Sequence, residues 1–356
     1  MRYAECYRIL QDWEHFSSNP HTRGGAEQLA GDLVITLDPP RQQKFRKVLN
    51  PYFSPARMRS LQPQIRAETD RLIDDFVQAG RGGDLAQVAW RQPGIVFFKY
   101  LLGMPTDDVP LCIELTDTAL NGETEEARMG AWGGGLYQHI HDAVTARTSG
   151  SARDDMIDVL LTAEIDGERL PLADVVSNAM LLVQAGLETT ANAMSFAFHY
   201  LACHPAERDR LIDEPDLVPR AVEEFIRFAG SIHGIPRTVA GEVELGGQVF
   251  CPPGESVLVN YAAANRDPDV FADADRCVLD RRENRHLGFG AGVHRCLGSN
   301  LARLEFQIGL KKQVLARMPD YTLAPDAEAV FHGSSVTRGF RSIPVVFNPP
   351  GQRSAA

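Results

Sequence analysis

The stretch HLGFGAGVHRCLGSNLAR, residues 286–303, decides the fold of this chain. It places one cysteine, Cys296, after a glycine-rich loop and directly before a predicted helix start near Gly298–Leu301. Unpaired amides and the positive end of a helix dipole favour a deprotonated sulfur, and a thiolate is a strong ligand for a soft metal. Glycines at every second position from 288 to 292 let backbone approach a flat, bulky group, and Phe289 offers a ring to pack on it.

Bulk composition excludes several classes of protein. The chain has 356 residues, a net charge of −11 and 44% hydrophobic residues, which is typical of a globular protein and unfavourable for nucleic-acid binding. Its six cysteines form no CxxC pair, which indicates reduced thiols. The charged start is no signal peptide, and no stretch is apolar enough to span a membrane. We predict a soluble cytoplasmic protein with one domain over residues 1–356.

Helical periodicity dominates the chain. It predicts helices over residues 3–16, 64–80, 217–228 and 300–318, and one unusually long helix between Pro171 and Pro205. That long helix is apolar nearly all round, so it should run through the core. Strand patterns occur only in the second half, over 242–250 with a Gly-Gly turn, 255–261 and 341–347. The predicted fold class is mainly α with small β-sheets.

The long helix carries a polar interruption, AGLETT, which sets Glu188 and Thr189 beside Ala185 and Gly186. A buried carboxylate needs water, a cation or a hydrogen-bond donor. A buried threonine hydroxyl can bond the carbonyl four residues back, here that of Ala185, and open the helix locally. The small residues leave room for a bound group. A satisfied polar pair with small packing neighbours is the alternative interpretation of this stretch.

One thiolate, a glycine-rich loop and a polar-interrupted helix together suit a haem with an open sixth position. A single cysteine cannot build an iron–sulfur cluster. His286, His294 and Cys296 are conceivable zinc ligands, but no fourth candidate lies nearby. Haem is therefore the favoured cofactor.

Four motifs resemble those of the cytochrome P-450 superfamily. FGAGVHRCLG, residues 289–298, resembles the haem-ligand loop Phe-x-x-Gly-x-x-x-Cys-x-Gly, and AGLETT resembles the oxygen-binding helix. EEFIR contains the Glu-x-x-Arg pair as Glu224 and Arg227, and DPPRQQKFRK, residues 38–47, resembles the proximal helix of the bacterial branch. The motifs occur in the family's order from residue 38 onward. The loop is a specific signal, whereas Glu-x-x-Arg alone is a weak one.

The resemblance implies roles for individual residues. Cys296 would be the axial thiolate, and Glu188 and Thr189 would manage protons for oxygen activation. Arg46, Arg237 and His294 would hold the propionates of haem b, with Gln42 a neutral contact as in the camphor-hydroxylase-like branch. The remaining haem contacts would be Ala185, Phe289, Gly290, Leu297 and Gly298. Glu224, Arg227 and Arg276 would be structural.

The resemblance also implies an activity. A haem-thiolate monooxygenase inserts one atom of dioxygen into a C–H bond of a small to mid-sized apolar substrate, with electrons from NAD(P)H through a ferredoxin. The segment from Arg41 to Arg66 holds seven basic and no acidic residues, so it is either a solvated helix face or the ferredoxin dock. The docking candidates are Arg41, Lys44, Lys47 and Arg57. A peroxide-driven enzyme and a non-catalytic haem protein are the alternative functions.

Substrate recognition is the least determined part. Residues 21–35 and 120–137 should supply pocket walls, and MGAWGGGLYQ, residues 129–138, suggests a mobile lid. Leu181, Gln184, His233, Val336 and Thr337 are the candidate substrate residues. Gln184 and His233 favour a substrate with a carbonyl or hydroxyl, because a plain hydrocarbon would leave both polar groups unpaired. The family's N-terminal helix and first strand have no counterpart here, so a short form of the protein is also expected.

Overall fold

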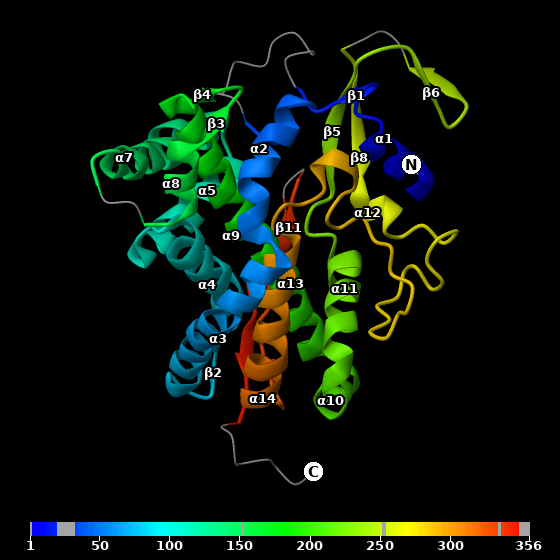
Figure 1. Cartoon of the computed structure of the whole chain (residues 1–356). Helices are drawn as coiled ribbons and strands as arrows, with labels where there is room; N and C mark the ends of the chain where they lie inside the picture. Colours follow the sequence, from blue (N-terminus) through cyan, green and yellow to red (C-terminus); the bar gives the residue numbers. More distant parts are fainter. Residues whose placement is uncertain (1, 20–32, 151–152, 251–253, 334–335, 349–356) are drawn as a thin grey trace.

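Helix α9, Leu172–Cys203, crosses the middle of the molecule behind α2 and α13 (Figure 1). The computed structural model describes residues 2–19, 33–150, 153–250, 254–333 and 336–348. Helices dominate these residues and the strands are short, which confirms the predicted fold class. The predicted long helix from Pro171 to Pro205 is confirmed as one uninterrupted element.

The remaining α-helices are α1 (Tyr3–Gln11), α2 (Arg41–Leu49), α3 (Pro55–Gln78), α4 (Ala86–Phe97), α5 (Val109–Asn121), α6 (Glu125–Met129), α7 (Gln138–Arg147), α8 (Met156–Thr162), α10 (Pro205–Asp213), α11 (Val218–Ala229), α12 (Tyr261–Ala264), α13 (Ser299–Ile308) and α14 (Leu315–Arg317). Short 3₁₀ or π segments are η2 (Asn50–Phe53), η3 (Phe98–Leu102), η4 (Thr106–Asp108), η5 (Gly130–Tyr137), η6 (Pro215–Leu217), η7 (Gly292–His294) and η8 (Gly309–Val314).

Helix α4 lies against α9 at very short range. A Cβ atom on Gly94 of α4 would stand 2.5 Å from Cγ1 of Val109 and 3.0 Å from Cδ2 of Leu187. A Cβ atom on Gly186 of α9 would stand 3.0 Å from the ring of Phe97. Larger side chains at either glycine would push the two helices apart. The small residues of the AGLETT motif thus serve helix packing as well as the site.

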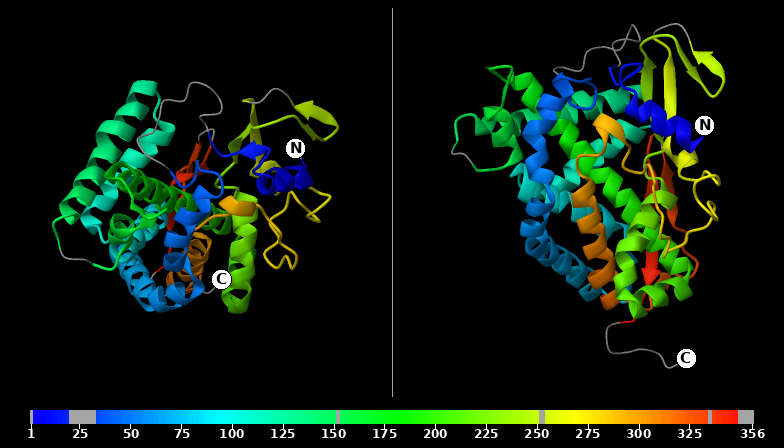
Figure 2. Two further views of the ribbon diagram at one scale, coloured as in Figure 1. Left: turned by 45° about the horizontal axis from the view of Figure 1, so that its top comes forward. Right: turned by 45° about the vertical axis from the view of Figure 1, so that its right-hand side comes forward.

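The strands form small antiparallel sheets; β1, β5 and β8 lie beside α1 and α12, whereas β3 and β4 lie beside α8 and β2 lies beside α3 (Figure 1, Figure 2). The strands are β1 (Phe16–Ser17), β2 (Gly82–Asp84), β3 (Glu164–Ile165), β4 (Glu168–Arg169), β5 (Gly234–Val239), β6 (Val243–Leu245), β7 (Gln248–Phe250), β8 (Ser256–Asn260), β9 (Thr322–Leu323), β10 (Val330–Gly333), β11 (Arg338–Ser342) and β12 (Pro344–Val346). The described strands pair in the orders β1-β5-β8, β2-β12-β9, β10-β11, β3-β4 and β6-β7. The predicted Gly-Gly turn joins β6 to β7, with positive φ at Gly246 and Gly247.

Two sequence expectations change in the structure. The predicted lid at 129–138 is helical, because η5 continues the backbone from α6 into α7 and buries Leu136 in the core. Most of the predicted wall at 21–35 lies outside the described residues, although Leu33 and Val34 are buried. Within the described ranges, no helix combines the length and the apolar character needed to cross a bilayer. The absence of the family's N-terminal helix and first strand, like the single domain over 1–356, stays a prediction.

Candidate active site

The loop before Cys296 is closed by its own backbone. The amide of Gly290 donates to the carbonyl of Leu287 at 2.9 Å, and the amide of Cys296 donates to the carbonyl of Phe289 at 2.8 Å. Gly292 has a φ of 67°, and a Cβ atom there would stand 2.0 Å from the carbonyl oxygen of Leu10. Only glycine fits at this point, because the loop rests directly on α1.

Cys296 lies just before α13, whose N-cap is Gly298, as the sequence predicts. Its side chain is exposed in this structure, and the charges of Arg46, Arg295 and Arg303 act on it. Burial raises the pKa of the Cys296 thiol, while the Gly298 amide and the charges of Arg46 and Arg295 oppose the rise. A metal cation would supply the missing stabilisation of the thiolate.

A charged cluster supports the loop from outside. Nε and Nη2 of Arg303 donate to Glu223, at 2.6 and 2.8 Å, and Nε2 of His286 lies 3.0 Å from the same carboxylate. Burial would raise the pKa of Glu223, but these hydrogen bonds outweigh it and hold the value at about 2. The Arg303 guanidinium also lies over the Phe289 ring, 4.4 Å from its centre. These contacts fix the ring that precedes the cysteine.

Helix α9 presents an accessible stripe toward the interior. Between Asp174 and Ser195, the residues that are not buried are Leu181, Ala185, Gly186 and Thr189. Three of them are spaced four apart, so they share one face of the helix. The Thr189 hydroxyl donates to the Ala185 carbonyl at 2.9 Å, as the sequence predicts, but the helix is not opened there. This stripe is a face of the core helix that protein side chains do not fully cover.

Glu188 lies on the neighbouring stripe and is only 1% exposed. Its Oε1 accepts hydrogen bonds from the hydroxyl of Thr337 at 2.7 Å and the amide of Asn192 at 3.3 Å. Its Oε2 has no partner among the described residues. The predicted requirement for a donor is thus met on one oxygen, by neutral groups. Thr337, a candidate substrate residue, is buried and bound to Glu188, and its contact with a substrate stays a prediction.

Three basic side chains meet on the other side of the ligand loop. Burial lowers the pKa of Arg46 and of Arg237, and it lowers the pKa of His294 to about 4, assisted by the charge of Arg237. Arg46 donates to the carbonyl of Arg295 and Arg237 to that of Pro236; within the described ranges neither shares a hydrogen bond with a carboxylate. Nε2 of His294 is buried without a described partner. A buried guanidinium group at Arg237, a half-buried one at Arg46 and an orphaned ring nitrogen fit a ligand with two carboxylates, which is what haem b carries.

The predicted haem contacts Gln42 and Leu297 and the predicted substrate residues Gln184 and His233 lie in different surroundings. The side-chain amide of Gln42 donates to the Val293 carbonyl at 2.7 Å, so Gln42 ties α2 to the ligand loop. Leu297 is partly buried against the core. Nε2 of Gln184 is buried without a described partner. The His233 amide donates to the Val336 carbonyl at 2.8 Å, and burial lowers the pKa of the His233 ring.

The Glu-x-x-Arg pair is fully buried in a dense network. Arg227 donates to both oxygens of Glu224 at 2.7 and 2.8 Å, and further donors are Arg281, Asn284 and the amide of Val278. Arg276 was predicted to join this pair as a structural residue. It supplies only its carbonyl oxygen, to Arg227, and the second guanidinium is that of Arg281. The Arg276 side chain is exposed, whereas the Arg281 side chain is 7% exposed and lies against Glu224.

The zinc alternative gains no support. Over the residues that the structure describes, no three His, Cys, Asp or Glu side chains gather as a metal site would need. His286 is engaged by Glu223 rather than by Cys296.

The fold and the site define a class of protein, and comparison with known proteins agrees. The family model described as Cytochrome P450 matches residues 135–316. The chain belongs to the cytochrome P-450 family, whose members are oxygenases that bind haem b through a cysteine thiolate.

Particular relatives have known names. The chain is 33% identical over 354 residues to the mycinamicin IV hydroxylase/epoxidase of Micromonospora griseorubida, covering 97% of this chain and 88% of that protein. It is 31% identical to the vitamin D(3) 25-hydroxylase of Pseudonocardia autotrophica, covering 96% of this chain and 84% of that one. Among solved structures, a mutant of the cytochrome EryK in complex with erythromycin B matches with a TM-score of 0.90 and 29% identity, over 99% of this chain and 92% of that chain.

Proposed function

We propose that this protein is a monooxygenase that inserts one atom of dioxygen into a C–H bond of an apolar substrate with a polar handle, using electrons that originate from NAD(P)H and arrive through a ferredoxin. The carrying observation is the accessible stripe of Leu181, Ala185 and Thr189 on an otherwise buried helix, together with an exposed Cys296. Both are proposed to line a hollow suited to a flat cofactor with one face free.

The residues fit haem b in distinct ways. Cys296 is the proposed axial ligand, and Arg46, Arg237 and His294 are the proposed donors to the propionates. Bound haem b supplies the two-electron activation of dioxygen and the transfer of one oxygen atom to carbon. Ala185 has only a methyl group, which leaves space for dioxygen beside the helix.

Glu188 and Thr189 are the proposed proton carriers. The overall reaction consumes dioxygen, two electrons and two protons and yields an alcohol and water. Thr189 lies on the accessible stripe, and Glu188 beside it keeps Oε2 without a described partner. A carboxyl group with a free oxygen can release a proton and take up another, whereas the hydroxyl orients water at the oxygen site. This pair favours dioxygen over peroxide as the oxidant, because peroxide already carries its protons.

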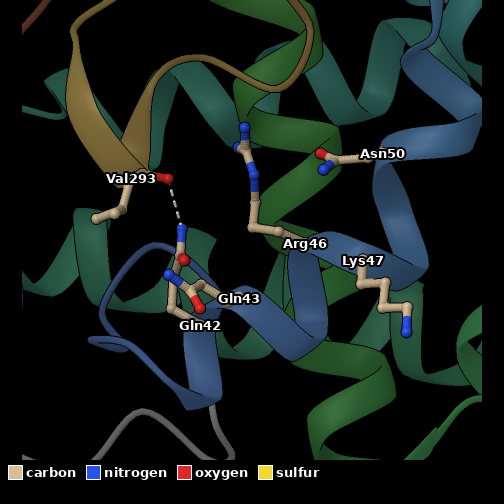
Figure 3. A pocket seen from close by; sticks show the side chains of 6 residues that line it. All are labelled: Gln42, Gln43, Arg46, Lys47, Asn50 and Val293. Atoms are coloured by element: carbon tan, nitrogen blue, oxygen red, sulfur yellow. Dashed lines mark hydrogen bonds between the residues drawn. The ribbon is translucent and has the colours of Figure 1, made fainter.

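The ferredoxin is proposed to dock over α2. A hollow of about 350 Å³ opens to solvent between α2 and the ligand loop, lined by Gln42, Gln43, Arg46, Lys47, Asn50 and Val293 (Figure 3). Its lining from α2 is polar and includes two basic side chains, which suits an acidic protein partner better than an apolar substrate. Lys44 forms an ion pair with Asp166, which reduces its expected contribution. Lys47 and Arg41 are exposed, and Arg57 is half-buried.

The substrate is proposed to be a terpenoid, steroid or aromatic ketone rather than a plain alkane. Gln184 keeps a buried amide nitrogen without a described partner, and the lowered pKa of His233 keeps that ring neutral and able to donate. A substrate carbonyl would satisfy such donors, each worth about 1–3 kcal/mol if left buried and unpaired. One matched structure, of a protein from Bacillus megaterium, holds testosterone, which supports this class.

The proposed function is tested by the carbon-monoxide difference spectrum of the reduced protein, followed by product formation. A thiolate-type spectrum that is lost in Cys296→Ser and kept in Cys277→Ser is expected. Product with a ferredoxin system and NAD(P)H supports the proposal. Product with peroxide alone points to the peroxide-driven alternative, and a normal spectrum without product under either condition points to a non-catalytic haem protein.

The substrate class is tested by spectral titration of ketones against their deoxy hydrocarbons. We expect tighter binding of the ketones, reduced in Gln184→Leu and His233→Phe. Equal affinities in the wild-type protein would reject the polar handle.

A further inference from the structure

Glu188 needs a route to solvent. Glu188 is the proposed proton carrier, yet its side chain is only 1% exposed and its described partners, Thr337 and Asn192, are neutral. A carboxyl group that delivers a proton in each turnover must be reprotonated from outside. Neither an amide nor a threonine hydroxyl has a pKa that lets it hold a spare proton. The proton source must therefore be another titratable group nearby.

The β10–β11 hairpin brings a histidine to this place. Strand β11 lies directly on α9, because a Cβ atom at Gly339 would stand 2.1 Å from Oδ1 of Asn192. His332 of β10 is the cross-strand partner of Gly339. Paired residues of antiparallel strands project from the same face of the sheet, so His332 projects toward α9 as well. Asn192 follows Glu188 by one helical turn, and the charge of Glu188 acts on His332, opposing the fall in its pKa that burial causes.

His332 is in turn connected to the surface. Its Nε2 lies 3.2 Å from Oδ1 of Asp117, on α5. Asp117 also forms an ion pair with Arg341 of β11. The exposed fraction of the side chains falls along this series, from 44% for Arg341 and 17% for Asp117 to 12% for His332. Glu188 completes the series at the buried end.

Several polar atoms between His332 and Glu188 have no described hydrogen-bond partner. Nε2 of His332, Oε2 of Glu188 and Oδ1 of Asn192 are buried and lack a hydrogen bond among the described residues. His332 and Asp117 are at ion-pair distance without the alignment of a hydrogen bond. Buried polar atoms of this kind take water as a partner, and water bridges are what a proton requires between such groups.

We propose that Asp117 and His332 form the proton entry route to Glu188. A proton taken up at Asp117 passes to Nε2 of His332, whose ring releases a proton toward Oε2 of Glu188, and Glu188 then serves the oxygen site. No electron moves in this relay, and each group returns to its starting state after one transfer. The charged groups around His332 are Glu188 from α9, Asp117 from α5 and Arg341 from β11. The proposal rests on the proposed function.

The test compares His332→Gln, Asp117→Asn and Glu188→Gln in the haem-loaded protein. We expect each to lower the product rate, by about tenfold for His332→Gln, with unchanged haem content and a larger solvent deuterium isotope effect. The double variant of His332 and Glu188 should be no slower than Glu188→Gln alone, because both act in one route. His199→Gln is the matched control. His199 belongs to α9 and stacks on Phe340 of β11, with ring centres 4.1 Å apart, so it lies at the same contact of α9 with the hairpin. Its replacement should leave the rate unchanged.

A second readout is independent of turnover. The titration of the His332 ring, followed by nuclear magnetic resonance with labelled histidine, should move to lower pH in Glu188→Gln, because a neighbouring negative charge is lost. An unmoved titration overturns the proposal. A slowed Glu188→Gln with wild-type rates in His332→Gln and Asp117→Asn also overturns it and leaves the proposed function intact. Wild-type protein without any ferredoxin-driven product removes the proposed function, and the entry route with it.

Discussion

Glu224 and Glu188 are both fully buried glutamates, but their surroundings differ in kind. Glu224 receives two hydrogen bonds from Arg227 and others from Arg281, Asn284 and the amide of Val278. Glu188 receives two from neutral side chains, both on the same oxygen. Burial would raise the pKa of Glu224, but its charged partners lower it overall. A saturated carboxylate holds elements in place, whereas a half-satisfied one keeps an oxygen for chemistry.

The largest expected effect is on the free energy of unfolding, when the fully hydrogen-bonded network around Glu224 is broken. Glu224→Gln leaves the buried Arg227 without a counter-charge, so it should lower the free energy of unfolding by about 3–5 kcal/mol. Glu188→Gln should lower it by less than about 1 kcal/mol, since an amide can still accept from Thr337. Denaturant unfolding of the haem-loaded proteins measures both. Similar losses for the two variants would remove the distinction between the regions.

Loss of the hydroxyl beside Glu188 tests the chemical region. Thr189→Ala should keep haem and substrate binding and lower the product formed per NAD(P)H by about tenfold, with the electrons diverted to peroxide and water. Thr189→Ser restores the hydroxyl and should restore the yield. Thr190→Ala, at a buried position off the accessible stripe, is the control. Wild-type yield in Thr189→Ala would show that the hydroxyl has no part in the reaction.

Acid should lower the stability of the fold through Glu223, the neighbour of Glu224 that His286 and Arg303 bind. Hydrogen bonds from His286 and Arg303 hold the pKa of Glu223 at about 2, below its ordinary value. A carboxylate with a lowered pKa stabilises the fold above the unfolded-state value and loses this contribution as pH falls through the folded-state value. The stability difference between wild type and Glu223→Gln, about 1–3 kcal/mol at pH 7, should therefore shrink as the pH falls from about 4.5 toward 2. Melting temperatures across this range measure it; a constant difference would contradict it.

The smallest effect is expected for the rate of reduction by ferredoxin, when a charge on α2 is reversed away from both buried glutamates. Lys47→Glu should slow ferredoxin reduction of the protein a few-fold at low salt, and the difference should vanish as salt screens charges beyond about 8–10 Å. Stopped-flow reduction measures the rate. Lys311→Glu, in η8 beyond the far end of α13, is the matched charge reversal and should have no effect. A salt-independent rate would argue against docking at α2.

Local sequence signals predicted much of this molecule. The 286–303 motif gave the loop and the start of α13, because glycine spacing and a following helix are local properties. The carbonyl partner of Thr189 was also predictable, since it lies one turn back on the same helix. The partner of Glu188 was not: Thr337 lies 149 residues away and comes into contact only through the packing of β11 on α9. The same reason explains why Arg281 was missed and Arg276 was favoured at Glu224. The glycines at 133–135 were assigned to a lid because of their composition, whereas the structure places them in the helical segment Gly130–Tyr137.

The ligand loop packs against α1, and this contact affects when α1 can fold during synthesis. Every partner that holds α1 comes much later in the chain: Tyr3 bonds Asp267 and the Arg285 carbonyl, Arg8 bonds the Glu244 carbonyl, and Leu10 touches Gly292. A helix of nine residues is not stable alone in water. On the ribosome α1 therefore remains unfolded until the Glu244 carbonyl, 236 residues after Arg8, has been made. The ligand loop gains its support from α1 only when Gly292 follows.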